Sequence, residues 1–188
     1  MKRQESSAVI LCGGLSRRMG TPKHELFLDR IISQLEGFKN IALSVRDYNQ
    51  VTNYGLPLWP DIVKDCGPLG GIYTALVMSK SEFVFVTPCD VPDINSGFID
   101  ELFANLKRDD SCLLPVINDE VQPLTGIYSV SCSERIKEVL ESKNFGVKRF
   151  LKSLNSGVHY VKFADEYKKF VRNINTPEEY ESWFQELS

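Results

Sequence analysis

The 188-residue sequence lacks long hydrophobic runs and an excess of positive charge. Its apolar runs are about five residues long, well short of a membrane span, and its charged start MKRQESS does not resemble a secretory signal. The formal net charge is −3, whereas a broad nucleic-acid surface needs a basic face. We therefore expect neither a membrane nor a nucleic-acid partner.

Residue types that bind metals or form disulfides are also sparse. The two histidines, His24 and His159, lie far apart, so a histidine-rich metal site is not predicted. The number of cysteines is odd and none has C-x-x-C spacing, which argues against a zinc site or a disulfide framework. Reduced thiols favour a cytoplasmic protein. The five cysteines are Cys12, Cys66, Cys89, Cys112 and Cys132.

Short apolar segments alternate with amphipathic ones along the chain. The alternation predicts βαβ units, and hence an α/β fold with a mainly parallel sheet in a single domain spanning residues 1–188. After Glu134 the strand signals become rare, which predicts a mostly helical tail flanking the sheet. Strands are predicted over 7–11, 40–45, 56–59, 82–88, 111–116 and 124–130, and helical spacing occurs over 28–35, 69–76, 99–106 and 136–140.

Ligands of open α/β sheets bind beyond the carboxyl ends of the strands, and a glycine pair follows the first predicted strand. Gly13 and Gly14 let backbone N–H groups approach a ligand closely, while Arg17, Arg18 and Lys23 supply cations suited to phosphate oxygens. The alternative is a tight turn followed by solvated basic residues. The loop matches neither the Walker pattern nor the dinucleotide fingerprint, which argues against a kinase or an NAD enzyme.

Carboxylates follow two further predicted strands. Asp90 is a candidate to bridge Mg²⁺ to a nucleoside triphosphate, because Mg²⁺ combines one or two carboxylates with phosphate oxygens. Asp61 is a weaker candidate, with a turn residue as the alternative, and Asp93 fits a capping role before the next helix. The glycine-rich turn at 67–71 could receive a base or an anion at a helix N-terminus, or simply begin a helix.

Seven motifs in this order carry a family resemblance: LCGGLSRRMG, TPK, GPLGGIYTAL, PCDVP, PLTGIYSV, VKRFL and NINTPEEY. Together the motifs resemble the MobA-type molybdenum cofactor guanylyltransferases of the nucleotidyltransferase superfamily. The resemblance implies a Rossmann-like three-layer α/β/α domain with a mainly parallel mixed sheet, similar to nucleotide-diphospho-sugar transferases. It also implies a Mg²⁺-dependent enzyme that transfers GMP from GTP to the phosphate of molybdopterin or the molybdenum cofactor, releasing pyrophosphate. Molybdoenzymes or their chaperones are implied as further partners.

The resemblance assigns the nucleoside to the first loop. Backbone groups of Leu11, Cys12 and Gly13 would contact guanine and ribose, Gly14 would keep the turn open, and Asp61 would contact the nucleotide.

The resemblance assigns the phosphate and pterin ends to other residues. Asp90 would bind Mg²⁺, while Arg18 and Lys23 would offset charge on the leaving pyrophosphate. Asn173 and Asn175 match asparagines near the pterin or metal end of the site. Because the attacking phosphate is already an anion, no general base is needed, which suits a chain poor in histidine.

Three features depart from the family pattern. Cys12 replaces the usual Ala, Ser44 stands where some members have a nucleotide-contacting Asn, and the segment between Lys23 and Ile31 is shorter than in relatives.

Three alternatives stay open. The first is a CTP-dependent cytidylyltransferase for the same pterin. Such relatives usually have Ala-Gly where this chain has Gly13-Gly14, so we take the second glycine position to favour guanine. The second is another small-molecule nucleotidyltransferase. The third is a catalytically silent nucleotide-binding module that regulates cofactor insertion.

Overall fold

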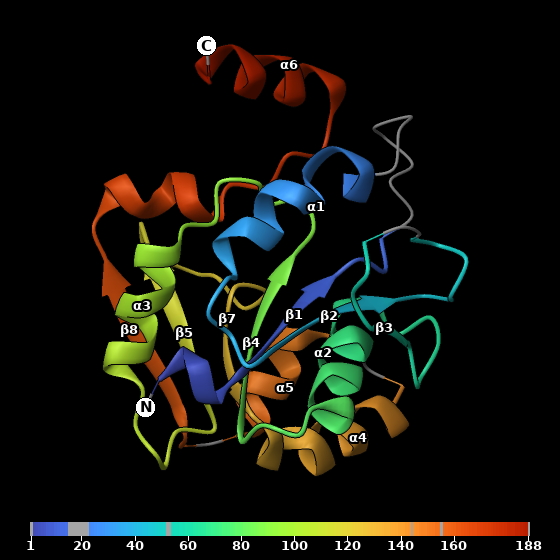
Figure 1. Ribbon diagram of the computed structural model, residues 1–188. Helices are drawn as coiled ribbons and strands as arrows, with labels where there is room; N and C mark the ends of the chain where they lie inside the picture. The colour runs from blue at the N-terminus through green and yellow to red at the C-terminus, as the bar shows by residue number, and fades with distance from the viewer. Residues whose placement is uncertain (1, 15–22, 52–53, 144, 155, 188) are drawn as a thin grey trace.

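The computed structural model describes residues 2–14, 23–51, 54–143, 145–154 and 156–187. Its centre is a mixed eight-stranded sheet in the order β3-β2-β1-β4-β7-β5-β6, with β8 also paired to β5 (Figure 1). The strands are β1 Ser7–Leu11, β2 Asn40–Val45, β3 Leu58–Pro60, β4 Phe83–Pro88, β5 Cys112–Ile117, β6 Glu120–Val121, β7 Gly126–Ser129 and β8 Val158–Phe163.

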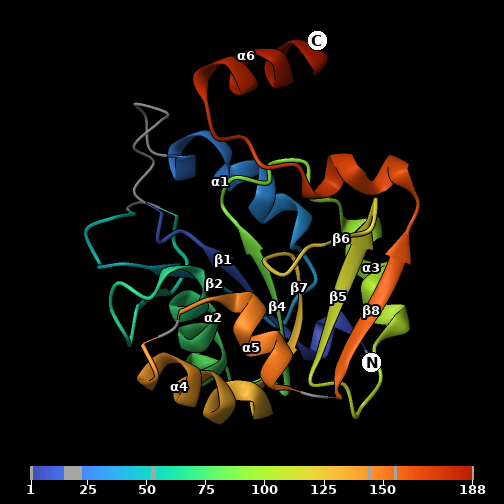
Figure 2. The same cartoon turned by 180° about the vertical axis from the view of Figure 1, so that it is seen from behind.

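Helices cover both faces of the sheet. Figures 1 and 2 show α1 and α3 on one face and α2, α4 and α5 on the other, while α6 lies at the end of the molecule near the start of α1. Within the described ranges, no helix is long and apolar enough to cross a membrane. The α-helices are α1 Lys23–Gln34, α2 Gly67–Met78, α3 Ser96–Asn105, α4 Ser133–Glu141, α5 Val147–Ser153 and α6 Pro177–Glu186, and the short 3₁₀ helices are η1 Arg3–Glu5, η2 Val130–Cys132 and η3 Asp165–Val171.

The β1 strand shows why the sheet needs both helical layers. All five of its residues are buried, because successive side chains point to opposite faces. Ala8 and Ile10 join the core formed with α1 and α3, whereas Val9 and Leu11 join the core formed with α2 and α4. A continuous apolar run is the expected signature of a strand covered on both sides.

The predicted α/β class with a mainly parallel mixed sheet is confirmed. Strands β1 to β4 pair in parallel, and β7 pairs antiparallel with both β4 and β5. The third strand covers Leu58–Pro60 rather than 56–59. The predicted scarcity of strands after Glu134 is wrong in one place, because β8 pairs along the whole length of β5.

The order of the strands creates a binding edge. β1 lies between β2 and β4, so the chain leaves β1 toward β2 through α1 on one face and returns to β4 through α2 on the other. Such a reversal of strand order opens a crevice at the carboxyl ends of the strands. By this rule we expect the crevice between the ends of β1 and β4, where Cys12 and Cys89 follow the strands.

Candidate functional site

The glycine loop begins one residue after β1. The Cys12 N–H donates to the Ser44 carbonyl at 2.8 Å, and the Cys89 N–H donates to the Leu11 carbonyl at 3.1 Å, so the parallel ladders extend to the crevice. Gly13 and Gly14 are exposed just beyond it. The structure thus presents the backbone of this loop at the strand ends, where we predict nucleotide contacts.

Asp61 lies beside the first glycine. A Cβ built on Gly13 would lie 3.7 Å from Asp61 Oδ2, so the loop backbone and this carboxylate face the same space. Ser44 Oγ donates to Asp61 Oδ1 at 3.4 Å, and the Asp61 N–H donates to the Val45 carbonyl at 2.8 Å. Ser44 therefore orients the Asp61 carboxylate.

Burial sets the protonation behaviour of Asp61. Loss of solvent raises the pKa of its carboxyl above the usual value, opposed by the Ser44 hydroxyl and by the charges of Lys64 and Arg46. Arg46 itself pairs with Asp65 at 3.0 Å on the exposed side of the site.

A third residue that contacts this loop, Gln50, was not predicted from the sequence. Its Nε2 donates to the Cys12 carbonyl and, at 3.4 Å, to the Gly14 carbonyl. Its Oε1 accepts from the Arg46 N–H at 2.7 Å. Gln50 is 38 residues from Cys12 along the chain and belongs to no motif, so only the fold brings the two together.

The glycine-rich turn before α2 is explained by packing. Gly67 has φ +60, the left-handed region that favours glycine. A Cβ on Gly70 would come within 3.1 Å of the Val63 carbonyl, and one on Gly71 within 3.1 Å of Ser44 Oγ. Glycine here lets α2 lie close against the strand ends that hold Asp61.

Asp90 follows β4 at the same edge and is joined to the C-terminal segment. The Ile174 N–H donates to the Asp90 carbonyl at 2.8 Å, which brings Asn173 and Asn175 to the neighbourhood of Asp90. Asn173 is exposed and Asn175 half-buried. Segments more than 80 residues apart in sequence thus lie side by side, and the roles of Asp90, Asn173 and Asn175 stay predictions.

Asp93 does not cap a helix, contrary to our expectation. Asn95 caps α3 instead, accepting from the N–H groups of Gly97 at 2.9 Å and Phe98 at 3.3 Å. Asn95 stands directly before α3 and two residues closer to it than Asp93, so its side chain reaches those N–H groups.

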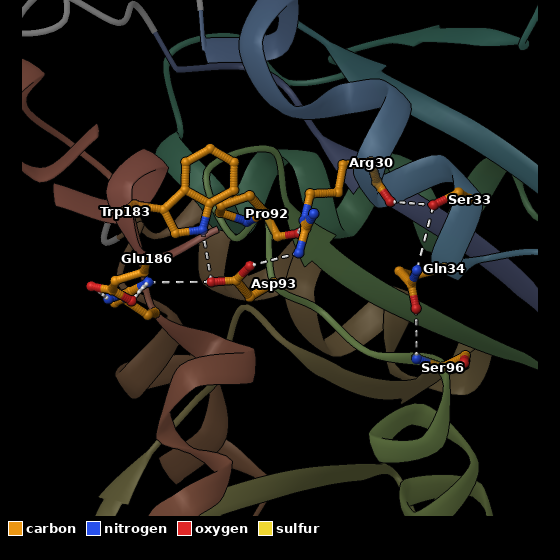
Figure 3. Close-up of polar contacts among 9 residues, drawn as sticks. Arg30, Ser33, Gln34, Pro92, Asp93, Ser96, Trp183 and Glu186 are labelled. Atoms are coloured by element: carbon orange, nitrogen blue, oxygen red, sulfur yellow. Dashed lines mark hydrogen bonds and ion pairs between the residues drawn. The ribbon is translucent and has the colours of Figure 1, made fainter. Parts of the chain in front are cut away.

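Asp93 is the centre of an ion-pair network. Its Oδ1 accepts from Arg30 Nη2 at 3.2 Å, and its Oδ2 accepts from Trp183 Nε1 at 2.8 Å, as Figure 3 shows. Arg172 Nη2 donates to the same Oδ2 at 3.3 Å and also pairs with Glu186 at 2.8 Å. The network joins α1, the loop after β4 and α6.

Aromatic contacts strengthen the same junction. Phe27 of α1 packs edge-on against Trp183 at 5.4 Å, and the Arg30 guanidinium lies 5.6 Å from the Trp183 ring centre. Helix α1, which begins at Lys23, is thus held by α6. The role of Lys23 stays a prediction, and Arg18 lies outside the described residues.

The two cysteines that follow β1 and β4, Cys12 and Cys89, are both buried. A hydrogen bond with Cys89, together with loss of solvent, raises the pKa of the Cys12 thiol well above its usual value, which disfavours the reactive thiolate of Cys12. A neutral thiol is a small, largely apolar side chain, which suits the buried position of Cys12 at the end of β1.

The side chains near Asp90 suit a metal ion that takes most of its ligands from substrate phosphates and water rather than from the protein. Among the described residues, no cluster of three or more His, Cys, Asp or Glu side chains could hold an ion. Asp90 offers one half-buried carboxylate at the crevice. Mg²⁺ bound through one carboxylate, phosphate oxygens and water is compatible with this arrangement.

Comparisons with known proteins agree with this geometry. The probable molybdenum cofactor guanylyltransferase of Clostridium perfringens is 34% identical over 94% of this chain and 95% of its own. The molybdenum cofactor guanylyltransferase of Haemophilus influenzae is 33% identical over 90% and 93%. The crystal structure of molybdopterin-guanine dinucleotide biosynthesis protein A from Archaeoglobus fulgidus superposes with a TM-score of 0.80 at 22% identity, covering 97% and 98%, and so shares the fold.

A family model described as a MobA-like NTP transferase domain matches residues 8–158. This match includes the glycine loop, Asp61 and Asp90, and the similarity to the curated relatives extends over most of both chains. The chain therefore belongs to the MobA-like NTP transferase family.

Proposed function

We propose that this nucleotidyltransferase transfers GMP from GTP to the phosphate of molybdopterin or the molybdenum cofactor and releases pyrophosphate. The reaction forms a bond between a pterin phosphate oxygen and the α-phosphorus of GTP, and it breaks the bond from that phosphorus to the pyrophosphate. The relatives named above support the pterin as acceptor.

One observation carries the choice of guanine, namely the Asp61 carboxylate beside the Gly13 backbone. An ionised carboxylate only accepts hydrogen bonds, whereas a backbone N–H donates them. Guanine carries N–H donors next to its O6 acceptor, so one edge of the base matches both groups. Cytosine has only its N4 amino group as a donor on the corresponding edge, which leaves the carboxylate less well matched.

The phosphate end works by position and charge. Asp90 would hold Mg²⁺, which when bound neutralises charge on the phosphates. Arg18 and Lys23 would offset charge on the departing pyrophosphate. Asn173 and Asn175, next to Asp90, would orient the acceptor at the pterin end. No residue needs to remove a proton, because the attacking phosphate is already ionised.

The proposal is tested by incubating the purified chain with molybdopterin, Mg²⁺ and either GTP or CTP, and measuring dinucleotide and pyrophosphate. We expect product from GTP and little from CTP. A preference for CTP would identify a cytidylyltransferase instead. Nucleotide binding without turnover would favour the silent regulatory module. We also propose that residues 1–188 act as one nucleotidyltransferase domain in the cytoplasm.

Asp61 predicts how GTP affinity depends on pH. Only the ionised carboxylate can accept both guanine N–H groups, and burial raises its pKa. GTP affinity should therefore begin to fall, on acidification, at a higher pH than an ordinary aspartate would cause. Folding stability shows the opposite trend, since a raised carboxyl pKa contributes stability at low pH that is lost as pH rises through the folded-state pKa.

Isothermal titration calorimetry with GTP across the acidic range checks this prediction. Asp61→Asn should bind GTP more weakly than the wild type at neutral pH and lose this part of the pH dependence. If Asp61→Asn retains the wild-type pH profile, another group titrates and Asp61 does not contact the base.

A further inference from the structure

Gln50 bridges two segments of the site with both ends of its side-chain amide. The NH₂ end donates to the carbonyls of Cys12 and Gly14, while the oxygen end accepts from the Arg46 N–H at 2.7 Å. The amide thus connects the loop after β2 to the glycine loop after β1.

The backbone around Gln50 is held in place by a turn and by the core. The Gln50 N–H donates to the Asp47 carbonyl at 3.2 Å, and the Asn49 N–H donates to Asp47 Oδ1 at 3.0 Å, closing a turn. The next residue, Val51, is 1% exposed and packs in the core beside α1. Because the backbone is fixed on both sides of Gln50, its side chain can order a flexible segment such as the glycine loop.

The glycine pair is such a segment. A Gly-Gly segment loses more conformational freedom on ordering than any other dipeptide. In a trans peptide the carbonyl and the following N–H point in opposite directions. Because Gln50 fixes the Cys12 carbonyl on its own side, the Gly13 N–H is directed away from Gln50.

We propose that Gln50 is a positioning residue that keeps the Cys12–Gly14 backbone ready to receive the nucleoside of GTP. This inference rests on the proposed function, since it concerns the same loop. A ligand that finds its partners already ordered binds more tightly, because ordering costs no further free energy on binding. The hydrogen bonds of the Gln50 side chain go to the glycine-loop backbone and to the Arg46 N–H, so we expect its effect to be on nucleoside affinity.

Gln50→Glu is the sharpest test. The carboxylate keeps the acceptor for the Arg46 N–H but removes both donors and repels the two carbonyls. We expect GTP affinity, and KM for GTP, to worsen by about 10-fold or more, with kcat within about 2-fold of the wild type. Affinity for tripolyphosphate, which lacks a nucleoside, should be unchanged.

Asn49→Asp is the matched control, because it makes the same amide-to-acid change on an exposed side chain one residue away. It should leave GTP affinity unchanged. In the unliganded protein, hydrogen exchange at Gly13 and Gly14 should accelerate in Gln50→Glu and not in Asn49→Asp.

The outcomes separate this inference from the proposed function. A wild-type chain that does not bind GTP overturns the proposed function. Unchanged GTP affinity in Gln50→Glu, when the wild type binds GTP, overturns only the role of Gln50. Equal losses for GTP and tripolyphosphate, or a lower unfolding midpoint that accounts for the loss, would show a general structural role and also overturn it.

Discussion

Asp90→Asn is expected to lower kcat for guanylyl transfer by at least about 100-fold, comparable to the loss of one preorganised group that stabilises transition-state charge. The amide has nearly the size of the carboxylate but lacks the charge that would hold Mg²⁺ at the phosphates. The backbone bond from Ile174 to the Asp90 carbonyl does not involve the side chain, so the C-terminal segment should stay in place. Steady-state rates at saturating GTP and molybdopterin over a range of Mg²⁺ concentrations measure the effect.

Asp109→Asn is the control for the change in charge. Asp109 is exposed and precedes β5, at the opposite edge of the sheet from Asp90. The Asp109→Asn variant should have the same activity as the wild type. If Asp90→Asn retains more than about a tenth of the wild-type rate, the loss is much smaller than removal of a transition-state-stabilising group causes, and Asp90 does not hold the metal.

Asp93→Ala should lower the free energy of unfolding by about 3 kcal/mol, because it removes a largely buried carboxylate that accepts three charged or N–H hydrogen bonds and leaves Trp183 Nε1 without this acceptor. The Asp93 side chain is 16% exposed and accepts from Arg30, Arg172 and Trp183. Urea unfolding followed by circular dichroism measures the loss. Trp183 fluorescence should report the release of α6 in the same experiment.

Two variants bracket this prediction. Asp93→Asn retains an acceptor for Trp183 and should lose less than Asp93→Ala. Asp100→Ala breaks the pair with Arg3, in which the Asp100 side chain is 61% exposed, and should cost less than about 1 kcal/mol. Equal stability of Asp93→Ala and Asp100→Ala would mean that the Asp93 network does not hold α6.

The sequence predicted the central strands because each reads as a nearly continuous apolar run. β1 and β4 have helices on both sides, so almost every side chain is buried, and Ser7 and Thr87 are the polar residues in two otherwise apolar runs. β8 was missed for the opposite reason. Its residues are only half-buried or exposed and include His159 and Lys162, so its place beside β5 depends on backbone pairing rather than on an apolar run.

Some site residues could be predicted from a local sequence pattern, whereas others could not. The placement of Gly13, Asp61 and Asp90 could be predicted because each lies within two residues of the end of a parallel strand, and parallel strands end at one edge. Gln50 and Asp93 could not, because their partners lie 38 and 90 residues away and leave no local pattern. A polar side chain that acts through distant backbone or side-chain partners is visible only in three dimensions.

The bond between Ile174 and Asp90 has a consequence for the order in which the protein is made. A chain emerging from the ribosome can form β1 to β4 early, since their parallel pairs lie within the first 88 residues. The neighbourhood of Asp90 is complete only when Asn173 to Asn175 have arrived and α6 has docked on Asp93. The segment that carries Gly13 and Asp61 would therefore form before the junction of Asp90 with Asn173 and Asn175, and an unfinished chain would lack that junction.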